Sequence, residues 1–159
     1  MERFALAREL VLQAGAALRE SRLREDEIQH KSGYQDLVTR WDKETEQFLR
    51  RGISEAFPQD IIVGEEYPAA NEGAEGCTWY LDPIDGTTNF TRRMNCSSVS
   101  VALVHNGQTE YGVVYNPFVG ELFAAQRGCG ATLNGAPIRA SSRDAAHAIV
   151  ACGSTIYDR

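Results

Sequence analysis

Apolar residues recur at helical spacing in two stretches of the amino-terminal third. From Glu2 to about Arg24, Arg and Glu separate apolar positions three or four residues apart, which predicts an amphipathic helix. These positions are Leu6, Leu10, Ala14, Ala17 and Leu18. A second helix is predicted to begin near Asp42, a plausible N-cap at the positive end of the helix dipole. Its apolar positions are Phe48, Leu49, Gly52, Ile53 and Ala56, and Pro58 lies just beyond its end. Since each helix has one apolar face, both need a partner layer.

After Pro58 the pattern changes to short β-type runs. Residues 97–104 alternate between apolar and small polar side chains, and Asn106-Gly107 is the favoured two-residue hairpin turn. The remaining predicted strands are 61–63, 78–81, 110–115, 121–125 and 148–151. Helices first and strands afterwards predict an α+β domain in which the two amino-terminal helices pack on a largely antiparallel β-sheet.

Composition and charge narrow the function classes. The chain has 159 residues, the size of one domain, and its net charge of −6 gives no electrostatic reason to expect nucleic-acid binding. No apolar run approaches the roughly 20 residues needed to cross a bilayer, and the amino terminus lacks a signal-peptide core. A cytoplasmic protein without a membrane partner is expected. The four cysteines form no CxxC pair, which favours free core thiols over a zinc or disulfide framework.

Carboxylates follow two of the predicted strands. Glu65 comes after 61–63, and Asp82 and Asp85 come after 78–81. The polar loop 67–76 joins the two strands, so we expect both acidic ends at one edge of the sheet. Magnesium is usually held by a few carboxylates and completes its shell with water and substrate phosphate. One ion would be shared by Glu65, Asp82 and the Ile84 carbonyl, and a second would bridge Asp82 and Asp85, as in two-metal displacement at phosphorus.

The residues after Asp85 suit a phosphate group. Gly86 permits close backbone approach, and Thr87 and Thr88 can open a short helical turn whose N–H groups favour an anion. The Thr87 hydroxyl can orient an attacking water if a carboxylate such as Asp42 accepts its proton. The ordinary alternative is that Asp-Pro and Asp-Gly are common turn formers. In that reading Glu65-Glu66 is a solvated strand end, Asp42 only a helix cap and Lys31 an exposed charge.

Three separate motifs, in this order along the chain, resemble the inositol monophosphatase family of magnesium-dependent, lithium-sensitive phosphatases. They are Lys31 to Asp42 (KSGYQDLVTRWD), Gly64-Glu65-Glu66, and Trp79 to Phe90 (WYLDPIDGTTNF). The resemblance continues through 112–115 and 128–131 to Asn134-Gly135, so it covers nearly the whole chain. It implies the first half of the layered αβαβα fold of sugar phosphatases.

The resemblance also implies residue roles, most of which the residues themselves had already suggested. It implies that Glu65, Asp82 and the Ile84 carbonyl hold a first Mg²⁺, that Asp82 and Asp85 contribute to a second, and that Glu65 helps with a weaker third ion. Glu66 would contact these ligands without binding the metal itself. The N–H groups of Gly86 and Thr87 would bind the substrate phosphate, next to Asp85. Thr87 and Asp42 would activate the attacking water, with Lys31 at the edge of the site.

The resemblance also marks a departure in length. Family members are longer, and their second half supplies another β layer, a Trp-Asp motif with a further metal ligand, and residues that contact the substrate alcohol. The expected organisation is therefore a single amino-terminal phosphatase domain over residues 1–159. Two functions compete: a hydrolase of small phosphate monoesters such as inositol monophosphate, and a truncated, poorly active domain that binds metal or phosphate or pairs with another chain. A homodimer is the partner that the family suggests.

Overall fold

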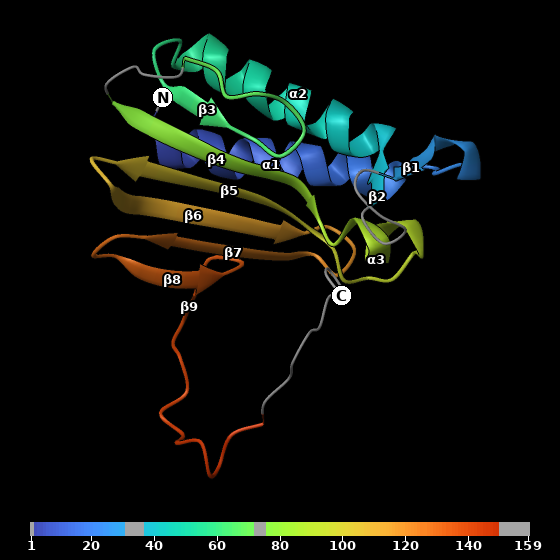
Figure 1. Ribbon diagram of the computed structural model, residues 1–159. Helices are drawn as coiled ribbons and strands as arrows, with labels where there is room; N and C mark the ends of the chain where they lie inside the picture. The colour runs from blue at the N-terminus through green and yellow to red at the C-terminus, as the bar shows by residue number, and fades with distance from the viewer. Residues whose placement is uncertain (1, 31–36, 72–75, 150–159) are drawn as a thin grey trace, which may run out of the picture.

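A computed structural model describes residues 2–30, 37–71 and 76–149 of the protein. Two long helices, α1 (Arg3–Glu20) and α2 (Arg40–Ala56), lie across one face of a seven-stranded sheet (Figure 1). The α+β architecture expected from the sequence, with the amino-terminal helices on a mostly antiparallel sheet, is confirmed. Among the described residues, no helix has both the length and the apolar character that crossing a bilayer requires.

The apolar stripes of both helices face the sheet, but their ends differ from the prediction. Helix α1 ends at Glu20 with Ser21 as its C-cap, earlier than Arg24, and Ala17 is exposed. Thr39, and not Asp42, is the N-cap of α2. Asp42 is the third residue of the helix and accepts a hydrogen bond from the backbone of Thr39, which completes a capping box. The hydroxyl of Thr39 is one turn earlier than the carboxylate, so it takes the capping position.

The large sheet is a meander whose strand order follows the chain. Its order is β3 (Ile61–Val63), β4 (Cys77–Asp85), β5 (Ser98–His105), β6 (Gln108–Asn116), β7 (Glu121–Gln126), β8 (Gly130–Leu133) and β9 (Ala136–Ile138). Only β3 and β4 are parallel; the other neighbours are antiparallel. The predicted turn between β5 and β6 is present, with positive φ at both Asn106 and Gly107, as a type I′ hairpin requires.

Several short elements were not predicted. The strands β1 (Ile28–His30) and β2 (Leu37–Thr39) pair as a separate two-stranded sheet, preceded by the 3₁₀ turn η1 (Glu25–Glu27). The strand predicted at 148–151 is wrong where it can be compared. Ala148 and Ile149 belong to no strand and Ile149 is 97% exposed, while 150 and 151 lie outside the described residues. An apolar run forms a strand only where it can pair with a neighbouring strand and bury its side chains against a partner layer.

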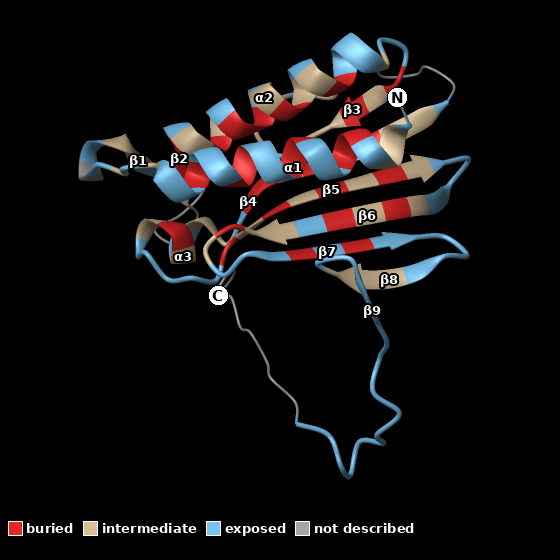
Figure 2. Ribbon diagram, turned by 180° about the vertical axis from the view of Figure 1, so that it is seen from behind, coloured by how far each residue is buried: buried red, intermediate tan, exposed pale blue. Residues whose placement is uncertain are grey.

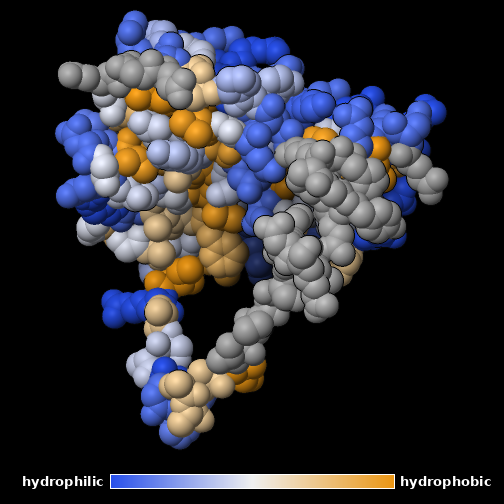
Figure 3. Space-filling view, in the orientation of Figure 1, coloured by the Kyte–Doolittle hydropathy of each residue, from blue (hydrophilic) through white to orange (hydrophobic). Residues whose placement is uncertain are grey.

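The two faces of the sheet differ in cover. The helix-covered face is buried (Figure 2), and at its centre Trp79 is fully buried between Phe57 and Tyr111. Trp79 and Tyr111 are therefore packing residues, as expected. The open face exposes alternate side chains of the same strands, which Figure 3 shows as apolar patches among polar atoms; they are Tyr80, Val114, Phe123 and Ile138.

The cysteines are only partly as expected. Cys77, Cys96 and Cys129 are free thiols. Cys77 is half-buried, whereas Cys96 and Cys129 are exposed, so the expectation of core positions fails for these two. Both lie outside the regular alternation of the strands, where the sequence gives no burial signal.

Candidate functional site

The ends of β3 and β4 bring the first carboxylates together. In the parallel ladder Val63 is paired with Tyr80, and two residues later come Glu65, just past the end of β3, and Asp82, within β4. The expectation that the two acid-tipped strands lie side by side is confirmed. Strand β4 continues through Pro83 to Asp85, however, and does not end at Leu81.

A bulge in β4 accommodates the Pro-Ile dipeptide. Asp82 is paired with Ser100 and Asp85 with Ser98, so three steps on β4 oppose two on β5. The chain turns at Gly86, directly after Asp85. The left-handed conformation of Gly86 (φ 84°) ends the strand, and the short helix α3 (Thr87–Thr91) follows. The predicted helical turn after Gly86 is confirmed.

Asp82 is the most perturbed carboxylate of the site. Its Oδ1 is buried and has no hydrogen-bond partner among the described residues. Burial, together with repulsion from Glu65, Asp85 and Asp42, raises the pKa of Asp82 to about 7. A buried carboxylate oxygen without a donor, surrounded by like charges, is costly unless a cation is bound there.

Asp42 is held in place by two threonines. Its Oδ2 accepts hydrogen bonds from the Thr39 N–H at 2.7 Å and from the Thr39 hydroxyl at 2.6 Å. Its Oδ1 accepts a hydrogen bond from the Thr87 hydroxyl at 3.0 Å. Burial raises the pKa of Asp42, and the hydrogen bonds from Thr39 and Thr87 oppose this rise. The contact between Asp42 and Thr87, which lie 45 residues apart in the chain, is thus present.

The Thr87 hydroxyl has a second neighbour, the Ile84 carbonyl oxygen, at 3.1 Å. The Ile84 carbonyl and the Asp42 carboxylate thus both contact the Thr87 hydroxyl. The sequence pattern did not single out Thr39, which is 1% exposed. The signal was available in Thr39-Arg40-Trp41-Asp42, because Thr and an acid three residues apart before an amphipathic run form a capping box.

Asp85 and Gly86 border a shallow hollow of about 310 Å³. Polar side chains, among them Asn89, Ser98 and Glu121, line it together with the apolar Val114 and Phe123. Gly86 is constrained here, because a side chain on it would come within 3.0 Å of the Cys96 carbonyl oxygen, which already accepts a hydrogen bond from Asn89.

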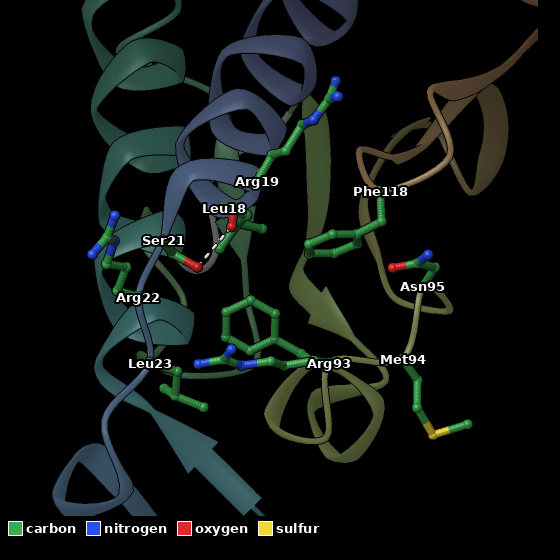
Figure 4. A pocket seen from close by; sticks show the side chains of 10 residues that line it. Leu18, Arg19, Ser21, Arg22, Leu23, Arg93, Met94, Asn95 and Phe118 are labelled. Carbon is green, nitrogen blue, oxygen red and sulfur yellow. Dashed lines mark hydrogen bonds between the residues drawn. The ribbon is translucent and has the colours of Figure 1, made fainter.

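A larger hollow of about 380 Å³ lies between the end of α1 and α3 (Figure 4). It combines arginine side chains with an apolar floor that includes Leu18 and Phe118. None of the predicted site residues lines it, so it is separate from the carboxylates.

The acidic side chains do not form a ready-made cage. Among the described residues, no three His, Cys, Asp or Glu side chains are arranged to hold a metal ion. Glu65 and Asp85 are exposed and Glu66 is half-buried. Lys31 lies outside the described residues. Binding a cation would therefore require side-chain rotations of exposed carboxylates toward the fixed oxygen of Asp82, and the metal ligands stay predictions.

Solved phosphatase structures share this fold. The Thermotoga maritima IMPase superposes with a TM-score of 0.82 at 34% identity, over 89% of this chain and 55% of that chain. An IMPase/NADP phosphatase complexed with Mg²⁺ and phosphate superposes with a TM-score of 0.69 at 26% identity, over 84% of this chain and 49% of that one.

The sequence comparison identifies the family. The model of the inositol monophosphatase family matches residues 1–159, and the chain belongs to this family. Inositol monophosphatase 3 of Solanum lycopersicum is 40% identical over 141 residues, which cover 87% of this chain and 52% of that protein. The chain thus spans about half the length of the curated relatives it matches.

Proposed function

We propose that the protein is a magnesium-dependent phosphate monoester hydrolase of the inositol monophosphatase type, acting on inositol monophosphate or a similar small ester. The observation that carries this proposal is the buried Oδ1 of Asp82, which has no hydrogen-bond partner in the part of the chain that the structure describes and lies near three further carboxylates. Family membership supports the choice of reaction, and the solved neighbour complexed with Mg²⁺ and phosphate supports the choice of ion.

The donor set fits a hard divalent cation. Carboxylate and carbonyl oxygens are the ligands that Mg²⁺ prefers, and a cation would offset the burial and the repulsion that raise the pKa of Asp82. Glu65, Asp82 and the Ile84 carbonyl would hold one ion, and Asp82 with Asp85 would contribute to a second. When bound, such ions supply electrostatic stabilisation of the phosphate oxygens. The Ile84 carbonyl oxygen lies 3.1 Å from the Thr87 hydroxyl, whose single hydrogen can go to only one acceptor at a time, so at least one of the two carbonyl lone pairs is open to a cation.

Thr87 would orient the attacking water, and Asp42 would accept the proton. The Thr87 hydroxyl donates its hydrogen toward Asp42, so its oxygen lone pairs can accept a hydrogen bond from a water molecule. Thr39 fixes the other oxygen of Asp42, which keeps the carboxylate oriented toward Thr87. The raised pKa of Asp42 makes it a better proton acceptor than an ordinary aspartate.

The phosphate of the substrate would lie at Gly86 and Thr87. Gly86 has no side chain to block the approach, and both residues begin α3, where N–H groups lack partners within the helix. The adjacent hollow, bordered by Asp85 and Asn89, can receive the polar alcohol part of a small ester.

Binding without useful turnover by these 159 residues alone is the second candidate. The chain spans 52% of its tomato relative, so positioning groups present in that relative need not be present here. Orientation of the leaving group contributes several kcal/mol to such reactions. In this alternative Mg²⁺ and phosphate still bind to the same residues.

Phosphate release from inositol monophosphate, titrated with MgCl₂, separates the two candidates. We expect Mg²⁺-dependent turnover that falls at least about 100-fold in each of two variants. Asp82→Asn removes a ligand of the cation, and Thr87→Val removes the hydroxyl that aligns the attacking water. The exposed Asp144→Asn serves as a control and should retain the wild-type rate. Mg²⁺ binding without turnover would establish the second candidate. A protein that neither binds Mg²⁺ nor releases phosphate contradicts both.

A further inference from the structure

A second carboxylate of α2, Glu46, is buried without belonging to the predicted site. It lies one helical turn after Asp42 and its side chain has no solvent exposure. A fully buried glutamate is rare unless it is paired. Its partners therefore reveal what it does.

Both oxygens of Glu46 have fixed partners. Oε1 accepts a hydrogen bond from Arg50 Nε at 2.7 Å, an ion pair one helical turn further along α2. Oε2 accepts a hydrogen bond from the Glu66 N–H at 2.6 Å, from a residue 20 positions later in the chain. Glu46 thus connects α2 directly to the segment that follows β3.

Gly64 completes this connection. A Cβ built on Gly64 would overlap the carboxylate of Glu46, so the glutamate packs directly against the glycine backbone. Gly64 and Glu66 are the two neighbours of Glu65. The backbone of Glu65 is therefore fixed on both sides by the same carboxylate.

Arg50 and Gln47 extend the contact by one residue. Arg50 Nη2 donates a hydrogen bond to the Tyr67 carbonyl at 2.9 Å, and Gln47 donates one to the Tyr67 hydroxyl at 2.7 Å. The side chain of Arg50 is only 15% exposed, so its pairing with Glu46 is shielded from solvent. The segment from Gly64 to Tyr67 is thereby attached to the same helix that carries Asp42.

We infer that Glu46 is a positioning residue that holds Glu65 at the carboxylate cluster, so that helix α2 orients both the Asp42–Thr87 pair and the cation ligand Glu65. This inference rests on the proposed function, because Glu65 is there a ligand of Mg²⁺. Groups that orient metal ligands typically change metal affinity by about 10- to 100-fold when they are removed. Glu46 acts through Glu65 and touches neither the substrate nor the reacting atoms.

The test measures the midpoint of Mg²⁺ binding from the rise of Tm with MgCl₂ concentration in the full 159-residue chain. Glu46→Gln keeps the shape of the side chain but loses its charge, and it should shift the Mg²⁺ midpoint upward by about tenfold. Ile53→Val removes a methyl group from the same helix at a fully buried position. This control should lower Tm without moving the Mg²⁺ midpoint.

Gly64→Ala is an independent second variant. It displaces the Glu46 carboxylate by steric overlap, so it should raise the Mg²⁺ midpoint in the same direction as Glu46→Gln. Gly112→Ala is its matched control, since a Cβ at Gly112 meets nothing within 4 Å. An unchanged Mg²⁺ midpoint in both Glu46→Gln and Gly64→Ala would overturn the inference.

Amide hydrogen exchange at Glu66 distinguishes this inference from the proposed function. Without metal, the Glu66 amide should be protected in the wild type and exchange at least about tenfold faster in Glu46→Gln, because its acceptor is weakened. A wild type that shows no response to Mg²⁺ would refute the proposed function and the role of Glu46 toward a cation. Equal Glu66 exchange in both proteins would refute the positioning itself.

Discussion

Asp60 and Asp82 are carboxylates at opposite ends of the β3–β4 pair, and they differ in every partner. Asp60 accepts two hydrogen bonds from Arg3, at 2.7 and 2.9 Å, and one from Trp79 Nε1 at 2.8 Å. Asp82 has a buried oxygen without a donor among the described residues, and its charged neighbours are acids. Asp60 is thus satisfied by the chain itself, whereas the buried oxygen of Asp82 has no compensating group among the described residues.

The pKa values show the same contrast. Burial raises the pKa of Asp60, but the hydrogen bonds from Arg3 and Trp79 outweigh burial and hold it below its usual value. For Asp82, burial and the repulsion from neighbouring acids act in the same direction and raise the pKa to about 7. The charged form is thus favoured at one end of the strand pair and disfavoured at the other.

The largest effect on stability is expected from Asp60→Ala. It leaves the Trp79 N–H buried without an acceptor and separates Arg3 from its partner, so the free energy of unfolding should fall by about 2 to 3 kcal/mol. Urea unfolding at pH 7 measures this loss. The exposed Asp144→Ala should change stability by less than about 0.5 kcal/mol. A loss of unfolding free energy in Asp60→Ala no larger than in Asp144→Ala would contradict the contrast between Asp60 and Asp82.

An intermediate effect on stability is expected from Thr39→Val, which takes a hydrogen-bond donor away from Asp42 and so makes it more like Asp82. The variant removes the N-cap of α2 and one donor to Asp42, so it should cost about 1 kcal/mol of stability. It should also raise the pKa of Asp42, because one hydrogen bond that opposes burial is lost. Urea unfolding and the carboxyl ¹³C shift of Asp42 against pH measure the two effects. Thr45→Val, at another buried threonine of α2, is the control.

The smallest effect, and the one with opposite signs at the two ends, is the pH dependence of stability without metal. The folded pKa of Asp82 is raised, so its stabilising contribution is complete below the unfolded pKa of about 3.9 and is lost as pH rises through about 7. The folded pKa of Asp60 is lowered, so its contribution is present above pH 3.9 and is lost as pH falls.

Urea unfolding in EDTA at pH 5 and pH 8 measures this difference. Relative to the wild type, Asp82→Asn should be more favourable at pH 8 than at pH 5, although solvent access to the side chain keeps the effect small. The same variant-to-wild-type difference at both pH values would show that Asp82 carries no excess proton in the folded protein.

Local patterns predicted the parts of the fold that depend on local periodicity. The stripe of α1, the Asn106-Gly107 hairpin and the short helical turn after Gly86 each follow from a few neighbouring residues. The adjacency of Glu65 and Asp82 was also predictable, because both follow apolar strands joined by one loop. The pairing of Asp42 with Thr87 took most of its weight from the family resemblance, since nothing local connects residues 45 positions apart.

Other features could not be read from the pattern for physical reasons. Glu46 lies among Lys43, Glu44 and Gln47, so its sequence context predicts a solvated helix face. It is buried because Arg50 and the Glu66 amide satisfy it, and the second of these contacts is tertiary. The prediction at 148–151 was wrong in the opposite direction: an apolar side chain, Ile149, was expected in a strand but is exposed to solvent.

The most direct test of the account is the dependence of Tm on MgCl₂ in the wild type, in Asp82→Asn and in Asp60→Asn at pH 7.5. If Asp82 is the carboxylate that awaits a cation, Mg²⁺ raises the Tm of the wild type and of Asp60→Asn, and Asp82→Asn shows no rise. A rise in Asp82→Asn equal to that of the wild type would contradict the account.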